Sequence, residues 1–297
     1  MSNHLAYTWL VACFALATHG CGGCDDAASN SGPVATATAT ASATVTPIAA
    51  PRRSDILDAH VRLAAGMIPM MLQAMADNGL ERVINLAGGN RADHSLDLWM
   101  AMQGEVKGRI VQCWNPPWSL LKKSKGDPTP LVHDLMDSVG MKYACASVGA
   151  PDAARPPGLR IDDPRFDPIW AKAAELRLPV YLHVQTDLPR RHPATRFILT
   201  RLPTGDIEAV LGDRRNVFMS LSAFGGSAPL SLIRRFPDRF VFGSGLAVTK
   251  EIRLAGSSAP LPYGELRPRF DAMRQALLPL GQDLRDRVYR TNLLAIF

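Results

Sequence analysis

The sequence lacks the features that mark fibrous, coiled-coil or disordered proteins. Only 20% of its 297 residues are charged and 47% are hydrophobic, which favours a globular protein and excludes collagen-like and coiled-coil structures. It contains no phosphate-binding glycine loop and no nucleophile elbow. The formal net charge of +6 comes without a recognised nucleic-acid motif, so we expect no nucleic-acid partner.

Cysteine is scarce beyond the amino terminus. Three of the five cysteines, Cys13, Cys21 and Cys24, fall within the first 24 residues, which leaves Cys113 and Cys145 for the remainder of the chain. Two isolated thiols on predicted strands favour buried core residues over redox or metal groups. We therefore expect no disulfide framework to hold the fold.

Charge is almost absent from the first 53 residues. Two aspartates and two arginines cancel there, so the whole net charge of +6 belongs to residues 54–297. Within this leader, Leu5–Ala17 is an uncharged apolar run of 13 residues. It is too short to span a bilayer of about 30 Å as a helix, but it has the length of a signal-peptide core. We interpret residues 1–24 as a signal peptide. The alternative is a buried amino-terminal helix, but the sequence offers no amphipathic segment that would pair with such a helix.

The end of the apolar run resembles the lipobox of bacterial lipoproteins. Small residues precede Cys21 and Cys24, and either cysteine is a candidate for lipidation. Residues 25–53 follow as an alternating Ala/Thr stretch with almost no large apolar residue, which is typical of a flexible linker. The resemblance implies an exported lipoprotein, anchored to a membrane on its periplasmic or cell-surface side.

Residues 54–297 alternate between short apolar runs and segments of helical period, such as Ile68–Asp77 and Pro168–Leu176. This alternation predicts an α/β fold with parallel strands joined by helices. The 244 residues that follow the leader suit one (β/α)8 barrel, which typically needs about 250 residues. The eight candidate strands are Ile56–Leu63, Arg82–Gly89, Arg109–Asn115, Met141–Gly149, Pro179–Gln185, Arg196–Leu202, Asn216–Ala223 and Arg239–Leu246.

One connection in this pattern is too short for a full helix. Only Thr186–Thr195 separates the fifth and sixth candidate strands, and it contains Pro189 and Pro193. A parallel crossover normally needs a dozen or more residues. We therefore expect a TIM-like barrel whose wall is thin between strands five and six.

Several segments together resemble the amidohydrolase-related superfamily of metal-dependent (β/α)8 hydrolases and decarboxylases. Asp58-Ala59-His60-Val61-Arg62 is similar to the Asp-x-His-x-His motif of the family's first strand. Gly158–His183 is similar to the family's helix that leads to a metal-binding histidine on strand five. The resemblance implies a divalent metal, such as zinc, at the carboxyl ends of the strands, where it activates a water molecule.

Carried over residue by residue, the resemblance implies a metal site that keeps only part of its ligands. His60 and His183 match metal-binding histidines, and Asp58 is also present. Arg62 replaces the second histidine of the first motif, and Arg201 replaces the histidine expected on strand six. A catalytic zinc ordinarily needs three protein ligands, and a protonated guanidinium repels a cation.

Gly245 stands where the resemblance implies an aspartate on strand eight that ligates metal and transfers protons. Glycine does neither, so the sequence identifies no catalytic residue. Whether the chain is an enzyme is therefore left open by the sequence, because family resemblance implies a hydrolase while three expected site residues are replaced.

Two functions are compatible with these replacements. In the first, which the ligand count favours, a degenerate relative with no tightly bound metal uses Arg62 and Arg201 to bind a small anionic molecule such as a carboxylate or phosphate. In the second, an active hydrolase or decarboxylase acts on a small carboxylate or cyclic amide. Its rebuilt metal site uses His60 and His183, with Asp58 or Asp187 as a further ligand. A third possibility is that neither function applies. Each arginine then pairs with an acid such as Asp58 or Asp187, and the two histidines are ordinary core residues.

Overall fold

The computed structural model describes most of residues 55–297. The described residues are 55–92, 99, 101, 103–106, 108–148, 159–183, 186–202, 206–225, 227–254, 257 and 259–297. The predicted signal peptide (residues 1–24), its cysteines Cys21 and Cys24, and the predicted linker (residues 25–53) lie outside the described residues.

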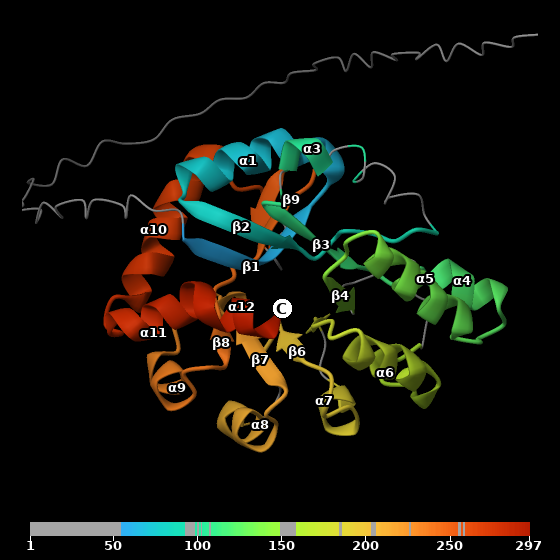
Figure 1. Cartoon of the computed structure of the whole chain (residues 1–297). Coiled ribbons are helices and arrows are strands. Elements are labelled where there is room, and N and C mark those ends of the chain that lie inside the picture. The colour runs from blue at the N-terminus through green and yellow to red at the C-terminus, as the bar shows by residue number, and fades with distance from the viewer. Residues whose placement is uncertain are drawn as a thin grey trace, which may run out of the picture. The chain divides into compact units, whose positions relative to one another are not determined.

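The predicted barrel is formed by a curled sheet of ten strands, mostly parallel, and helices surround the strands (Figure 1). All eight candidate strands are present, most of them shorter than predicted. The strands are β1 (Ile56–Leu63), β2 (Leu80–Asn85), β3 (Ile110–Trp114), β4 (Cys145–Val148), β5 (Val180–Leu182), β6 (Phe197–Leu199), β7 (Val217–Ser220) and β8 (Phe240–Val241).

The predicted eighth strand, Arg239–Leu246, is split in two. β8 ends at Val241, and β9 (Leu246–Val248) then pairs in parallel with β1. In the segment between β8 and β9, the carbonyl of Phe242 accepts a hydrogen bond from the amide of Ala59 on β1 at 2.8 Å. The chain that follows β8 therefore contacts β1 and closes the ring. β10 (Ile252–Leu254) adds an antiparallel strand beside β9, which the sequence pattern did not predict.

Most helices pack outside the strands, as Figure 1 shows. Met71 and Met75 of α1 are fully buried and pack in the core. Among the described residues, no helix combines the length and apolar character that crossing a membrane would require. The α-helices are α1 (Ile68–Asp77), α3 (Gln103–Val106), α4 (Trp118–Lys123), α5 (Thr129–Gly140), α6 (Asp167–Glu175), α7 (Leu188–Arg191), α8 (Ile207–Asp213), α9 (Leu230–Arg235), α10 (Leu266–Leu277), α11 (Gln282–Asp286) and α12 (Asn292–Ile296); short 3-10 turns lie at Ala65–Met67, Pro164–Phe166, Leu221–Phe224 and Tyr263–Glu265, and a π-helical turn lies at Arg287–Thr291.

The short connection between β5 and β6 is confirmed. It contains only α7, a helix of four residues, although β5 and β6 are direct neighbours in the sheet. The side-chain amide of Asn216 donates to the carbonyls of Pro189, His192 and Thr195 at 2.9–3.0 Å. This one side chain therefore satisfies backbone acceptors that a full helix would have satisfied itself.

The interior of the barrel forms its own apolar cluster, separate from the core between strands and helices. α12 closes one end of it, because Asn292 donates to the carbonyls of Pro237 and Phe240 at the start of β8. That end is the amino-terminal end of the strands, so the opposite, carboxyl-terminal end holds the predicted site. The interior cluster comprises Leu57, Ala59, Ile84, Leu86, Cys113, Cys145, Tyr181, Ile198, Val241, Leu293 and Ile296.

A disulfide joins Cys113 to Cys145, which corrects the prediction of two isolated thiols. Both cysteines are fully buried in the barrel interior, as expected for core residues. They are also register partners on the neighbouring parallel strands β3 and β4, with their Cα atoms 4.4 Å apart. The separation of 32 residues in the sequence carries no information about this register, so the pairing could not be predicted from spacing.

We predict that removing this disulfide lowers stability by about 3 to 4 kcal/mol, because a crosslink across 32 residues restricts the unfolded chain by that amount. The double variant Cys113→Ala, Cys145→Ala avoids leaving a lone thiol in the core. Urea unfolding of this variant and of the non-reduced wild type measures the difference. Equal free energies of unfolding would show that the two cysteines contribute no crosslink.

Candidate functional site

The predicted site residues converge at the carboxyl end of the barrel. His60 lies on β1 and His183 directly follows β5, yet their ring centroids are 5.5 Å apart. Arg62 lies two residues beyond His60, and Arg201 follows β6. Both arginines are close enough to His183 to act on it electrostatically. The barrel therefore brings side chains from β1, β5 and the end of β6 to the same end of the strands.

Asp58 is a buried link between β1 and the segment that closes the barrel. Its Oδ1 accepts hydrogen bonds from the backbone amides of His60 (3.0 Å) and Ser244 (2.9 Å). Burial raises the pKa of Asp58 to about 6, although the donors from Ser244 and His60 lower it in part. Its Oδ2 is buried and has no hydrogen-bond partner within the described part of the chain.

His183 uses both ring nitrogens in hydrogen bonds to hydroxyl groups. The hydroxyl of Thr200 donates to the carbonyl of Leu182 (3.2 Å), so it is free to accept from Nδ1 of His183, which lies 2.6 Å away. Nε2 then carries the lone pair and accepts from the hydroxyl of Ser147 at 3.1 Å. Burial, followed by the charges of neighbouring groups, holds the pKa of His183 well below its ordinary value. His183 is therefore a neutral imidazole with no uncommitted nitrogen.

His60 is held by one hydroxyl group. Its Nδ1 lies 2.6 Å from Oγ of Ser222, which in turn lies 2.8 Å from Oγ of Ser220. Burial, with a smaller effect of the Arg62 charge, lowers the pKa of His60 to about 3, so this imidazole is also neutral. Its Nε2 is buried and finds no hydrogen-bond partner among the described residues.

These donors do not fit a catalytic metal. Zinc binding requires three protein ligands with available lone pairs. Among the described site residues, the buried atoms without a hydrogen-bond partner are Nε2 of His60, Oδ2 of Asp58 and the hydroxyl of Tyr181, which is a neutral phenol because burial raises its pKa. In the described residues, no group of three or more His, Cys, Asp or Glu side chains is placed to hold a metal ion. Asp187 is exposed at the start of α7. Asp162 raises the pKa of the exposed Arg160, and the charge of Asp187 adds a smaller effect in the same direction.

Gly245 has a backbone conformation that favours glycine. Its φ angle is +68°, in the left-handed region that side chains rarely adopt, and its amide donates to the carbonyl of His60 at 3.0 Å. An aspartate at this position would be strained. Gly243 is restricted as well, because a Cβ atom there would lie 2.1 Å from Oγ of Ser220 and 3.1 Å from Cβ of His60.

The two arginines place positive charge around one imidazole. Arg62 is half-buried on β1 and Arg201 is exposed beyond β6. Both lower the pKa of His183, and Arg62 also lowers that of His60. The arrangement therefore combines two guanidinium groups with neutral imidazoles and hydroxyls, which are groups that recognise oxyanions.

The hydroxyl groups that hold the two histidines were not predicted from the sequence. Ser147 lies on β4, Thr200 directly follows β6, and Ser222 lies just beyond β7. Their position at the carboxyl ends of predicted strands was the available signal, because these ends meet in a parallel barrel. Tyr181 was also missed: burial and the nearby charge of Asp58 raise the pKa of its phenol well above the ordinary value.

The chain belongs to the amidohydrolase family, whose model matches residues 148–297. This matched region contains His183, Arg201 and Gly245 of the candidate site. No curated protein matches the chain.

Solved structures share the barrel at low sequence identity, which shows the fold alone. An uncharacterised TIM-barrel protein from Bordetella bronchiseptica is 11% identical, with 81% of this chain and 97% of that chain covered and a TM-score of 0.58. A dihydroxybenzoic acid decarboxylase from Polaromonas sp. JS666, solved with bound manganese and the inhibitor 2-nitroresorcinol, is 12% identical, with 81% and 96% covered and a TM-score of 0.56. 2,6-Dihydroxybenzoate decarboxylase, solved from Rhizobium and in complex with 2,6-dihydroxybenzoate, is 14% identical, with 81% and 98% covered and a TM-score of 0.54.

Proposed function

We propose that this chain is a metal-independent member of the amidohydrolase family that binds a small carboxylate at the carboxyl end of its barrel. One observation carries the proposal. Both ring nitrogens of His183 are held by hydroxyls, while the charges of Arg62 and Arg201 both act on the same ring. The position that resembles a metal ligand is therefore surrounded by positive side chains instead of by ligands.

The charges of the site support an anionic ligand. Two guanidinium groups supply the two positive charges that a divalent metal would supply, and each can bind a carboxylate through two parallel hydrogen bonds. The neutral imidazoles add no charge at pH 7 because burial lowers their pKa values. Glycine at position 245 removes the negative charge that the family's aspartate would place beside the ligand.

The fold relatives support a carboxylate of aromatic type. One of them is solved in complex with 2,6-dihydroxybenzoate, and another is a decarboxylase of a dihydroxybenzoic acid. A hydroxybenzoate is therefore a suitable probe for the binding site of this chain. In this proposal the bound carboxylate is the ligand, and no residue is assigned a catalytic role.

A second candidate function is an active metal-dependent hydrolase or decarboxylase. Oδ2 of Asp58 and Nε2 of His60 are both buried without hydrogen-bond partners among the described residues, and they would supply two metal ligands. This function needs a third ligand, and Nε2 of His183 would provide it only after the hydroxyl of Ser147 had released that nitrogen. The metal content of the purified protein distinguishes the two functions.

We predict that isothermal titration calorimetry detects the binding of 2,6-dihydroxybenzoate to the full-length protein. The double variant Arg62→Ala, Arg201→Ala should bind this ligand at least tenfold more weakly. Hydrogen bonds to charged groups contribute roughly 1.5 to 3 kcal/mol each, which supports this magnitude. Inorganic phosphate, titrated in parallel, tests whether the site selects a carboxylate.

The matched control is the double variant Arg234→Ala, Arg267→Ala, which removes two exposed arginines from α9 and α10. It should bind like the wild type. An absence of binding heat in the wild type, or equal affinity in the Arg62, Arg201 variant, would contradict a carboxylate site at these arginines.

We also propose that the chain is exported and held at a membrane through a lipid on Cys21 or Cys24. The signal-like run at Leu5–Ala17 and the linker-like residues 25–53 support this proposal. The buried disulfide between Cys113 and Cys145 supports it independently, because such bonds form and persist in oxidising compartments.

Metabolic labelling with palmitate should tag the full-length chain, and the Cys21→Ala, Cys24→Ala variant should lose the label. Cys13→Ala is the matched control, since this cysteine lies inside the apolar run and should not carry the lipid. A double variant that still takes up palmitate and partitions with membranes would contradict lipid anchoring at these cysteines.

A further inference from the structure

The amino-terminal end of the barrel, opposite the candidate site, is rich in arginine. Four strands each place one residue in or against the interior apolar cluster: Ile84, Val111, Ile198 and Val241. Side chains alternate between the two faces of a strand, so the residue two positions earlier lies on the same face, nearer the amino-terminal end. In all four strands this residue is an arginine: Arg82, Arg109, Arg196 and Arg239.

Backbone pairing and side-chain contacts place these arginines at the end of the barrel interior. The carbonyls of Arg109, Arg196 and Arg239 accept hydrogen bonds at 2.8–2.9 Å from amides of the neighbouring strands, so each continues its strand by one residue. The guanidinium group of Arg239 lies over the ring of Phe218, which packs against the interior cluster. Nη1 of Arg196 donates to the carbonyl of Ala295 in α12 at 3.5 Å. The arginines therefore lie around the end that α12 closes.

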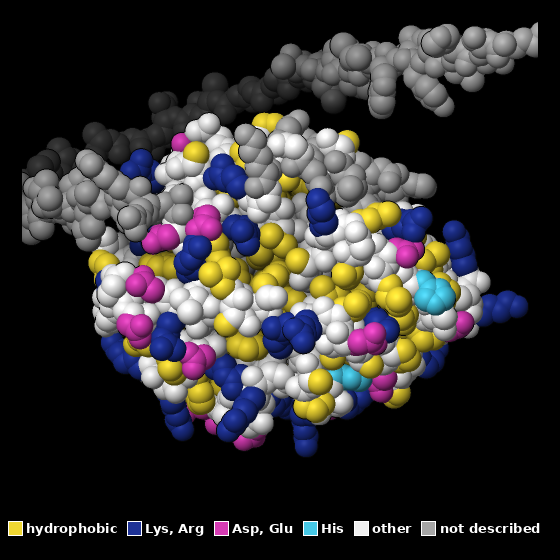
Figure 2. All heavy atoms as spheres, in the orientation of Figure 1, with side chains coloured by type: hydrophobic (Ala, Val, Ile, Leu, Met, Phe, Trp, Pro, Cys, Tyr) yellow, Lys and Arg dark blue, Asp and Glu magenta, His cyan; other side chains and the backbone are white. Residues whose placement is uncertain are grey.

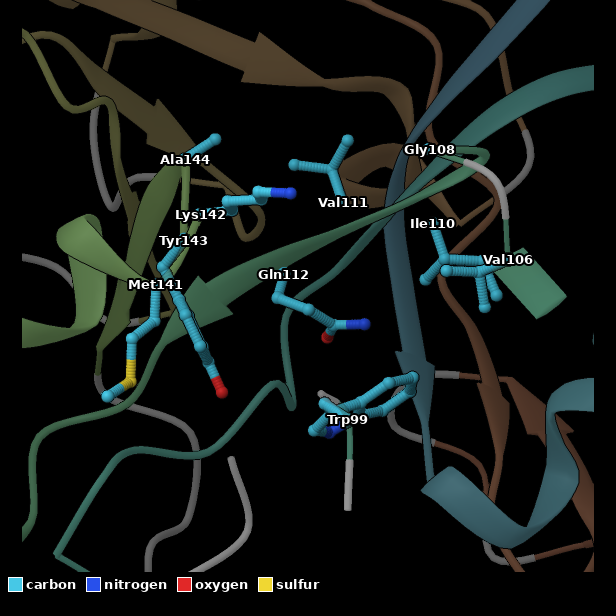
Figure 3. Close-up of a pocket in the computed structure, with 10 residues that line it drawn as sticks. All are labelled: Trp99, Val106, Gly108, Ile110, Val111, Gln112, Met141, Lys142, Tyr143 and Ala144. Atoms are coloured by element: carbon cyan, nitrogen blue, oxygen red, sulfur yellow. The ribbon is translucent and has the colours of Figure 1, made fainter. Parts of the chain in front are cut away.

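Three further basic residues lie in the loops that lead into the strands at this end. Lys142 precedes β4, Arg177 precedes β5 and Arg215 precedes β7, and all three are exposed. Figure 3 shows the ammonium group of Lys142 directed toward Val111, on the opposite side of β3 from Trp99. Because Val111 packs against the interior cluster, this charge lies on the side of β3 that faces the barrel axis.

The positive charges of this end are not neutralised by acids of the described residues. None of the seven basic residues forms an ion pair within the described part of the chain, and the guanidinium groups of Arg109, Arg196 and Arg239 donate to backbone carbonyls instead.

The acids Glu81 and Asp238 pair with other arginines, namely Arg290 and Arg287. Asp55 and Asp213 also lie at this end, but they are outnumbered by the seven basic residues. This end therefore carries an excess of positive charge.

The centre of this end is apolar. α12 places Leu293 and Ile296 in the barrel interior, and its other side leaves Leu294 and Phe297 exposed by 45% and 39%. Figure 2 shows apolar side chains gathered near the centre of this face, with Lys and Arg side chains around them. Exposed apolar residues flanked by Lys and Arg are typical of proteins that lie on anionic membrane surfaces.

The chain also enters the barrel at this end. Asp55, the first described residue, precedes β1 at the amino-terminal end of that strand. The leader, which the proposed lipid anchor places at a membrane, therefore joins the barrel on the face that carries the basic residues. Residues 1–53 have no net charge, so the barrel must supply any attraction to anionic lipid.

We propose that the amino-terminal end of the barrel docks on an anionic phospholipid surface. The basic residues would contact lipid phosphates, and Leu294 and Phe297 would enter the membrane interface. Docking in this way turns the carboxyl end of the barrel, with the candidate site, away from the membrane. The position of the leader supports the proposal only if the proposed anchoring holds, whereas the charges and the apolar centre support it independently.

The test uses the full-length chain without its lipid, as the Cys21→Ala, Cys24→Ala variant. Co-sedimentation measures its affinity for vesicles of phosphatidylcholine with and without phosphatidylglycerol. We expect about tenfold stronger binding to the vesicles that contain the anionic lipid, because each Lys or Arg near such a surface contributes about 1 kcal/mol. The uncharged run at Leu5–Ala17 should bind both kinds of vesicle alike, so the ratio of the two affinities reports on the barrel.

Adding Arg177→Glu and Arg215→Glu should bring this ratio close to one. Both side chains are exposed, so their replacement leaves the core intact, and a circular dichroism melt confirms that the variant is folded. The matched control adds Lys122→Glu and Lys123→Glu instead. These exposed lysines lie on α4, which follows the carboxyl end of β3, and their replacement changes the net charge by the same amount. The control should keep the preference for anionic vesicles.

Equal binding of the lipid-free chain to both kinds of vesicle would overturn the proposal. Equal losses in the two charge variants would overturn it as well, because they would show an effect of net charge alone. A dimer that Arg177→Glu and Arg215→Glu dissociate, without any preference for anionic lipid, would show instead that this face joins two copies of the chain. Because the tested chain carries no lipid, failure of this test is distinct from failure of the palmitate labelling.

Discussion

The contact between β1 and the segment Phe242–Gly245 is the constraint on which the site depends. Ala59 donates to Phe242, Ser244 donates to the carboxylate of Asp58, and Gly245 donates to the carbonyl of His60. These bonds close the ring of strands and fix His60 opposite His183. Because Gly245 has a left-handed φ angle, an aspartate at this position, which the family resemblance predicts, would be strained; Gly243 next to it has no space for a Cβ atom.

The chemistry at the carboxyl end follows from this closure and from the surrounding charges. With the glycine in place, Asp58 is the acidic residue that contacts the backbone of His60, and burial raises its pKa. The positive charges of Arg62 and Arg201 repel a metal ion and attract an anion, as the proposed function requires. The opposite end of the barrel is closed by α12. Figure 1 shows α12 at the centre of the face that is turned to the viewer, and Figure 2 shows apolar side chains gathered at the centre of the same face. The two ends of the barrel therefore differ in chemistry.

The order of strands and helices was predictable from apolar periodicity, and so was the short connection after β5, because Pro189 and Pro193 leave no room for a full helix. Features that depend on distant pairing were not predictable. The split of the eighth strand reflects a left-handed Gly245, and the disulfide reflects the register of β3 and β4. His60 and His183 were found through their motifs, whereas the hydroxyls that hold them have no motif of their own.

Metal content tests the account most directly. The full-length protein, expressed with added zinc, manganese and iron and purified without chelators, should contain well below one such ion per chain by elemental analysis, because His183 has no nitrogen to spare. About one tightly held transition metal per chain would contradict the account, since firm retention requires a real set of ligands. If that metal were lost in His60→Ala, the ion would be placed at the site described above.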